Sequence, residues 1–141
     1  MLQRIQSVWL LLAALCAAFT YRIAFYSGNK LGTDNKPVYE KLTASSNFIL
    51  LITTALLVAG CLYTIFIYRN RKQQLWLAIG AAGLSLINLL IYFSEAKKFL
   101  PNENSYGLGA VLAIAIPILS VLAARGIWKD EKLVKSVDRL R

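Results

Sequence analysis

Long apolar stretches alternate with short polar ones along the whole chain of 141 residues. Four stretches contain no charged residue, namely residues 5–21, 42–68, 73–94 and 104–124. A helix needs about 20 mostly apolar residues to cross the hydrocarbon core of a bilayer. Three stretches are long enough, and the first is too if it continues past Arg22, whose long side chain can reach the headgroups. The pattern therefore predicts four transmembrane helices, at residues 5–26, 46–68, 74–94 and 106–128.

The composition agrees with a membrane protein. Hydrophobic residues make up 57% of the chain and charged residues only 16%, whereas a typical soluble domain has about 25% charged residues. The segment between the first two predicted helices contains SGNKLGTDNKP, which is rich in turn-forming residues, so we expect a short exposed loop there. We expect a single membrane domain over residues 1–141.

Small residues recur at spacings of three and four in the predicted helices. Lipid provides no hydrophobic drive for helix association, so such faces are expected where backbones approach closely. They are Ala13, Ala17, Thr20 and Ala24 in the first helix, Ala81, Ser85, Asn88 and Tyr92 in the third, and Ala110, Ala113, Pro117, Ser120 and Ala124 in the fourth, with Ala55 and Ala59 the best face of the second. This spacing predicts an all-α fold in which four transmembrane helices form an up-down-up-down bundle. The alternative is a looser ribbon of hairpins that another protein completes.

Two residues inside the predicted helices are candidates for packing or for a polar groove. Asn88 lies near the middle of the third helix, where an unsatisfied amide is costly. We expect it to bond to a neighbouring helix, and the alternative is that it contacts a ligand. Pro117 lies in the middle of the fourth helix and predicts a kink there, as a packing feature or as a hinge.

The chain closes with the charged segment KDEKLVKSVDRLR, residues 129–141. On a helix, Leu133, Val134, Val137 and Leu140 group on one side, and Lys132, Lys135, Asp138 and Arg139 lie around the others. The segment therefore predicts a short amphipathic C-terminal helix that lies on the inner membrane surface or against a partner. It is a poor nucleic-acid arm, because its three acids leave little net positive charge and it has no aromatic residue for stacking.

The distribution of basic residues predicts the orientation in the membrane. Four spans place both termini and the loop RNRK, residues 69–72, on one side. That side carries Arg4, Arg69, Arg71, Lys72, Arg125, Lys129, Lys132, Lys135, Arg139 and Arg141, which is ten of the sixteen basic residues. The positive-inside rule then places both termini in the cytoplasm. The same basic residues, Arg69, Arg71, Lys72, Arg139 and Arg141, are candidates to contact anionic lipid headgroups or a partner.

The residue types argue against an enzyme. The chain has no histidine, and none of its seven acids lies inside a predicted span. This removes the usual haem ligand, the commonest proton shuttle and the carboxylate that a proton-coupled exporter needs. The two cysteines, Cys16 and Cys61, both lie inside predicted spans and form no paired motif. We expect no catalytic residue, no metal site and no cofactor.

Several segments resemble those of a known family. The opening MLQRIQSVWLLLA, the loop RNRKQQ, and the closing YGLGA and IWKDEKLVKSVDRLR are similar to a family of uncharacterised four-span membrane proteins of Bacteroidota, defined as a domain of unknown function. The resemblance covers the whole chain and is strongest in its last third. It implies a location in the inner membrane of a two-membrane envelope. The family carries no established activity, so the resemblance assigns no functional residue.

The sequence favours a protein that acts by association. We expect a non-enzymatic accessory or assembly subunit of an inner-membrane complex, in contact with membrane lipids and with a protein partner or further copies of itself, but not with nucleic acid. Leu133, Val137 and Leu140 are the apolar candidates for that contact. The alternative is a small transporter or lipid-handling protein with a polar groove near Asn88 and Pro117.

Cysteine labelling tests the predicted orientation. In a variant with Cys16 and Cys61 replaced by alanine and Asn70→Cys introduced, the new thiol should react with a membrane-impermeant maleimide only after the cells are opened, because the loop at residues 69–72 is predicted to be cytoplasmic. Lys36→Cys, in the same background, is the control and should react in intact cells. Labelling of position 70 from outside contradicts the orientation.

Overall fold

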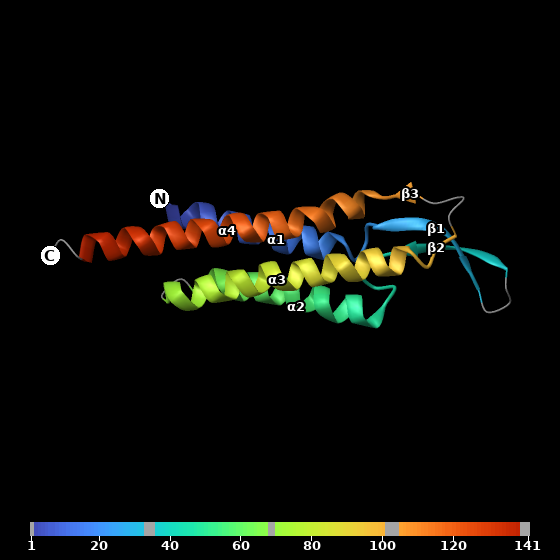
Figure 1. Cartoon of the computed structure of the whole chain (residues 1–141), viewed down its shortest axis with the longest axis horizontal. Coiled ribbons are helices and arrows are strands. Elements are labelled where there is room, and N and C mark those ends of the chain that lie inside the picture. Colours follow the sequence, from blue (N-terminus) through green and yellow to red (C-terminus); the bar gives the residue numbers. More distant parts are fainter. Residues whose placement is uncertain (1, 33–35, 68–69, 101–104, 139–141) are drawn as a thin grey trace.

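The protein is described by a computed structural model that covers residues 2–32, 36–67, 70–100 and 105–138. Within this part the chain forms four helices, α1 (Leu2–Phe19), α2 (Phe48–Phe66), α3 (Arg71–Ala96) and α4 (Leu108–Asp138). The helices lie side by side along the long axis of the molecule (Figure 1). α1 and α3 each pack against both α2 and α4. Both termini and the α2–α3 connection lie at one end, which we call the terminal end, and the strands lie at the other, the sheet end.

Three of these helices are long and apolar enough to cross a membrane. They are α2, α3 and the part Leu108–Val134 of α4, whereas α1 contributes only the shorter apolar helix Ile5–Phe19. Large apolar side chains point outward along the helical body, as Leu90 does with 68% of its surface exposed. An outward apolar surface suits lipid and not water, because soluble proteins rarely expose large contiguous apolar patches.

The predicted first span, residues 5–26, is too long. α1 ends at Phe19, and the chain then turns. The Thr20 hydroxyl donates to the Ala17 carbonyl (2.7 Å), while the Thr20 carbonyl accepts from the Ala44 amide (3.0 Å). The main chain at this turn thus bonds to the loop between β2 and α2, so the helix does not continue through Arg22. Arg22 itself is exposed.

The sheet end contains a three-stranded antiparallel sheet that the all-α prediction missed. Its strands are β1 (Tyr26–Leu31), β2 (Pro37–Leu42) and β3 (Ser105–Tyr106), in the order β2-β1-β3. The segment predicted to be an exposed loop thus forms a hairpin. Residues such as Gly28, Asn29 and Lys30 have low strand propensity, so the pairing depends on tertiary contacts at the base of the sheet.

Aromatic rings supply those contacts. Phe25 stacks on Tyr92 of α3, with ring centroids 4.6 Å apart, and Tyr26 meets Phe99 (5.4 Å) and Tyr106 (4.9 Å) edge to face. Phe25 and Tyr92 are both 1% exposed. Such pairs add about 0.5–1.5 kcal/mol each beyond their buried area. The aromatic cluster therefore ties the sheet to α3 and fixes where the hairpin begins.

The core of the helical body is built from small residues, as the spacing predicted for three helices. Ala13, Ala17, Ala81 and Ala113 are at most 7% exposed. The prediction for the second helix was wrong, because Ala55 and Ala59 are exposed. The buried face of α2 instead consists of Leu50, Thr54, Leu57, Cys61 and Thr64.

The C-terminal tail was predicted to be a short amphipathic helix on the inner membrane surface or against a partner, and the structure shows it as helical but not as a short helix of its own. α4 continues without interruption from Leu108 to Asp138 and includes Pro117. Residues 129–138 are therefore the last turns of the long helix. Residues 139–141 lie outside the described part of the chain.

Two glycines let α4 begin in direct contact with the main chain that connects α1 to β1. The Gly107 amide donates to the Phe25 carbonyl and the Gly109 amide to the Ala24 carbonyl, each at 3.0 Å. A Cβ on Gly109 would lie 2.5 Å from the Ala24 carbonyl carbon and 2.6 Å from the Ile23 oxygen. Main-chain atoms cannot move aside as a flexible side chain can, so only glycine fits here.

Gly109→Ala should therefore destabilise the fold. We expect a loss of about 1–3 kcal/mol, the usual cost of overpacking, seen as a lower midpoint of thermal unfolding in detergent. Gly83→Ala in α3 is the matched control, because a Cβ there meets nothing within 4 Å, and it should be neutral or slightly stabilising. Equal midpoints for the two variants would contradict the close approach.

Candidate functional site

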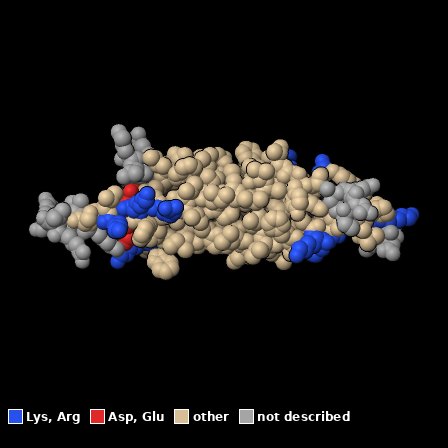
Figure 2. Space-filling model, turned by 45° about the horizontal axis from the view of Figure 1, so that its top comes forward, with Lys and Arg blue, Asp and Glu red and all other residues tan. Residues whose placement is uncertain are grey.

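Charged residues gather at the two ends of the molecule, and the visible face of the middle is free of them (Figure 2). The described contact residues that the sequence predicted belong to the terminal end. Arg71 and Lys72 begin α3, and Leu133 lies in the last turns of α4. Arg69, Arg139, Leu140 and Arg141 lie outside the described residues, as does the side chain of Val137. The described part of the predicted site is thus Arg71, Lys72 and Leu133.

A polar cluster joins three helices at the terminal end. The Gln6 amide of α1 donates a short hydrogen bond to the Asp130 carboxylate of α4. Arg71 of α3 donates through Nη1 to the Asp130 main-chain carbonyl at 3.4 Å. Gln6 is only 4% exposed, and its hydrogen bond to the half-buried Asp130 is partly shielded from water. Arg71, predicted as a lipid or partner contact, therefore has an internal bonding role, whereas Lys72 is exposed.

A second polar bond links α2 to α3 near the same end. Gln74 is 3% exposed, and its Nε2 donates to the Thr64 carbonyl at 3.2 Å. Thr64 is also buried and donates its hydroxyl to the Gly60 carbonyl at 2.6 Å. The residues predicted from the sequence did not include Gln6, Gln74 or Asp130. Glutamines at the ends of apolar stretches were the available signal, because buried amides require partners.

Beyond this cluster α4 continues alone. Figure 1 shows its last turns extending past the ends of α1, α2 and α3. Leu133 is 54% and Val134 42% exposed, and Trp128 before them is 56% exposed. The Lys132 Nζ lies 5.9 Å from the centroid of the Trp128 ring, within cation–π range. A hollow of about 320 Å³ lies on this part of the helix, with Lys129, Lys132, Leu133 and Ser136 among its lining.

Asn88 bonds to a neighbouring helix, as the sequence predicted. Its Nδ2 donates to the Thr53 hydroxyl (2.8 Å) and to the Thr54 hydroxyl (2.9 Å) of α2. The side chain is 3% exposed. Both amide hydrogens are therefore used inside the helical body, and Asn88 gives no support to a polar groove. Pro117 is likewise buried, in the face of α4 that packs on the other helices.

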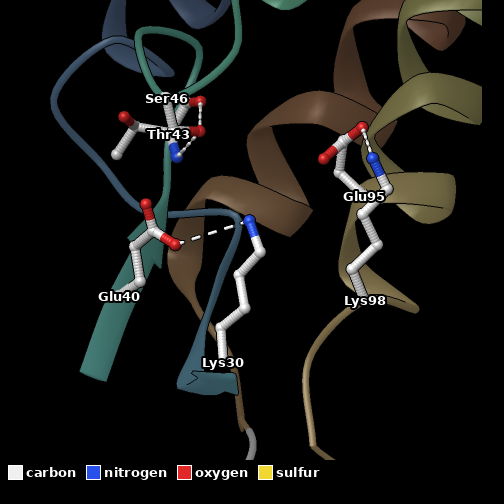
Figure 3. Close-up of polar contacts among 6 residues, drawn as sticks. All are labelled: Lys30, Glu40, Thr43, Ser46, Glu95 and Lys98. Atoms are coloured by element: carbon white, nitrogen blue, oxygen red, sulfur yellow. Dashed lines mark hydrogen bonds and ion pairs between the residues drawn. The ribbon is translucent and has the colours of Figure 1, made fainter. Parts of the chain in front are cut away.

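The sheet end carries local ion pairs. Lys30 and Glu40 pair across the β1–β2 hairpin at 3.6 Å, and Lys98 pairs with Glu95 at 2.6 Å at the end of α3, as Figure 3 shows. The Ser46 hydroxyl donates to the Thr43 carbonyl at 2.7 Å and closes the turn before α2. These contacts neutralise charge and stabilise turns. They do not bring a nucleophilic side chain next to a side chain that could act as its base.

Possible metal ligands do not cluster either. Among the residues that the structure describes, no three His, Cys, Asp or Glu side chains come together. Cys16 and Cys61 are free thiols. The most distinctive site is therefore the terminal end, where a buried polar cluster anchors a projecting helix.

A double-mutant cycle tests this anchor. Gln6→Ala and Asp130→Ala should each destabilise the protein, and their effects should be coupled by about 1 kcal/mol because the two side chains share a partly shielded hydrogen bond. Unfolding in detergent measures the free energies. Lys129→Ala, an exposed neighbour, is the control and should add to Gln6→Ala without coupling. Additive effects of Gln6 and Asp130 would contradict the anchor.

Comparison with known proteins places the chain in a family but assigns no activity. A family model described as "Domain of unknown function (DUF4293)" matches residues 2–140. Neither the curated proteins nor the solved structures contain a match to this chain. The match covers almost the whole chain, including all the described helices and strands. The chain therefore belongs to the DUF4293 family.

Proposed function

We propose that this protein is a non-enzymatic subunit of a membrane complex, which binds a partner through the projecting end of α4. We further propose that all four helices span the bacterial inner membrane as an up-down-up-down bundle. Both termini then lie in the cytoplasm. The positive-inside distribution of basic residues supports this orientation, and the resemblance to Bacteroidota proteins supports the compartment.

The observation that carries the proposal is the uninterrupted course of α4. From Asp130, at the level of the polar cluster, to Asp138 the helix adds eight residues, or about 12 Å at 1.5 Å per residue. An amphipathic helix that lies in the headgroup plane needs a break where it leaves the span, but α4 has none at Trp128 or Lys129. The projecting turns therefore point away from the bilayer along the axis of their own span.

A partner protein fits this projection better than lipid does. Leu133 is 54% and Val134 42% exposed. They belong to the last turns of α4, which extend past the ends of the other described helices (Figure 1), and lysines accompany them at positions 129 and 132. Such a face, apolar and flanked by cations, is the kind that packs in an apolar groove with an acidic rim. The Gln6–Asp130 bond at its base supports the same role, because it anchors the projecting turns to α1.

The transporter or lipid-handling alternative has less support. It depends on a polar groove near Asn88 and Pro117, and both residues are buried in packed faces. The Asn88 amide is also satisfied by two threonine hydroxyls. We therefore retain association as the proposed activity.

Photocrosslinking in intact cells tests the proposal. A photoreactive phenylalanine analogue at position 133 should give one discrete protein adduct, and Val134→Asp should reduce its yield about tenfold, because a carboxylate in the contact must be desolvated. Both side chains are exposed, so neither change should alter thermal unfolding.

The matched control is the same analogue at Leu90, which is 68% exposed on the helical body. This position faces lipid in the proposed arrangement and should give no protein adduct that depends on Val134. A position 133 that labels only lipid, or an adduct insensitive to Val134→Asp, would overturn the proposed contact. An adduct with twice the mass of the protomer would identify the partner as a second copy.

A further inference from the structure

Within the described part of the chain, the free edge of β2 is a second surface without a partner. β2 is at the end of the strand order β2-β1-β3, so only one of its edges is paired. Five of its six residues are exposed, with Val38 55% and Tyr39 62% exposed. An edge strand presents a row of unpaired main-chain groups to solvent. This edge lies at the sheet end, far from the projecting turns of α4 (Figure 1).

The register shows which groups face the free edge. The Gly32 amide donates to the Lys36 carbonyl at 3.0 Å, one pair beyond Leu31↔Pro37. Hydrogen-bonded pairs alternate along an antiparallel ladder, so the even-numbered residues of β2 bond to β1. On the other side of β1, the Asn29 carbonyl accepts from the Leu100 amide, which agrees with this alternation. The odd-numbered residues Pro37, Tyr39 and Lys41 therefore direct their main-chain groups outward.

Pro37 fits the same register. Proline has no amide hydrogen and is tolerated in an edge strand only where its nitrogen faces away from the ladder. The free edge thus offers the amides of Tyr39 and Lys41 and the carbonyls of Pro37, Tyr39 and Lys41. These groups match the hydrogen-bonding pattern that an added strand requires.

A second copy of this chain is a poor occupant of the edge. The strands run along the long axis of the molecule (Figure 1). Antiparallel pairing of two β2 strands would point the two helical bodies in opposite directions, so both cannot lie in one membrane. Parallel pairing about a two-fold axis would place equal-numbered residues opposite each other, so the odd-numbered residues would direct their main-chain groups outward in both copies. In a parallel ladder, however, each outward residue bonds to the residues before and after the one opposite it. Those are even-numbered here, and their groups point to β1.

Charge indicates the chemistry of the partner. Glu40 is already paired with Lys30, as Figure 3 shows. Among the described residues, neither Lys36 nor Lys41 takes part in an ion pair. Both are exposed and flank the free edge. Carboxylates on the added strand would therefore meet two cations that form no ion pair with another described residue.

We propose that the free edge of β2 binds an extended acidic segment of a partner protein by strand addition. The outward groups of Tyr39 and Lys41 form the ladder, and Lys36 and Lys41 select acidic side chains. On the orientation proposed above, this partner lies outside the cytoplasm. The proposal does not depend on the role of α4, since the two surfaces are at opposite ends.

Hydrogen exchange on the full-length protein in phosphatidylcholine nanodiscs tests the pairing. The probes are two synthetic peptides of about ten residues in which pairs of glutamates or pairs of lysines alternate with pairs of valine and threonine. Both faces of the added strand then carry charge, as the positions of Lys36 and Lys41 on opposite faces require. At low salt the acidic peptide should bind about tenfold more tightly than the basic one, as measured by fluorescence anisotropy. It should slow exchange of the Tyr39 and Lys41 amides about tenfold. The Val38 and Glu40 amides should not change, because they already bond to β1.

Two variants at one position separate main-chain pairing from side-chain contact. Tyr39→Pro removes an outward amide and should weaken binding of the acidic peptide about tenfold, whereas Tyr39→Val keeps that amide and should bind nearly as the parent does. Lys41→Glu should reverse the preference toward the basic peptide.

Several outcomes would overturn the proposal. These are equal affinity for the two peptides, unchanged exchange at Tyr39 and Lys41, or equal binding by the proline and valine variants. A smaller oligomer for Tyr39→Pro than for Tyr39→Val would assign the edge to a second copy instead. Exchange at Tyr39 and Lys41 in the parent protein decides the matter even if Tyr39→Pro does not fold.

Discussion

The direct contact of main chain with main chain at Ala24, Gly107 and Gly109 is the interaction on which the rest of the structure depends. Two amides of the segment that begins α4 bond to carbonyls of the segment that follows α1. This contact places β3 beside β1. It also sets the first turn of α4 against the main chain that connects α1 to β1, and so brings the last helix next to the first. No side chain fits between the two backbones, so the geometry follows from the absence of Cβ at two positions.

Small residues and isolated polar bonds continue this close packing along the helical body. In lipid, apolar side chains gain nothing from hiding against one another, so helices associate through tight van der Waals contact and hydrogen bonds. The alanine faces of α1, α3 and α4 provide the first, and the Asn88–Thr53–Thr54 group and the Gln74–Thr64 bond provide the second. The large aliphatic side chains are consequently left for the outer surface. The Asn88 and Gln74 amides thus bond from one helix to the next.

The two ends are built differently. At the terminal end, a buried amide, a carboxylate and a guanidinium hold three helices, and one helix continues beyond them. At the sheet end, aromatic rings hold a short sheet whose outer strand is exposed. Within the described residues, each end therefore combines an anchored base with an exposed extension, one helical and one extended. This arrangement suits the proposed role, in which the protein makes contacts at both of its ends.

The sequence by itself determined the helices α2, α3 and α4, because a charge-free stretch of this length has to satisfy its main-chain groups within a helix if it enters a bilayer. It also determined the packing faces of α1, α3 and α4 and the partner type of Asn88, since small residues and a lone amide have few alternatives there. Of the candidate site, the sequence named Arg71 and Leu133 as candidate contacts with lipid or a partner, but it did not indicate the bond between Gln6 and Asp130.

Only the tertiary structure decided the remaining features. α1 ends at Phe19 and the hairpin forms because Thr20, Phe25 and Tyr26 meet partners far away in the chain, namely Ala44, Tyr92 and Phe99. The buried face of α2 is set by its neighbours, since it mixes bulky and small residues while Ala55 and Ala59 are exposed. The direction of the C-terminal turns depends on whether α4 bends on leaving the bundle. Periodicity describes the faces of a helix but not where its axis points, and the axis is set by the contacts that Gln6 and Arg71 make with Asp130.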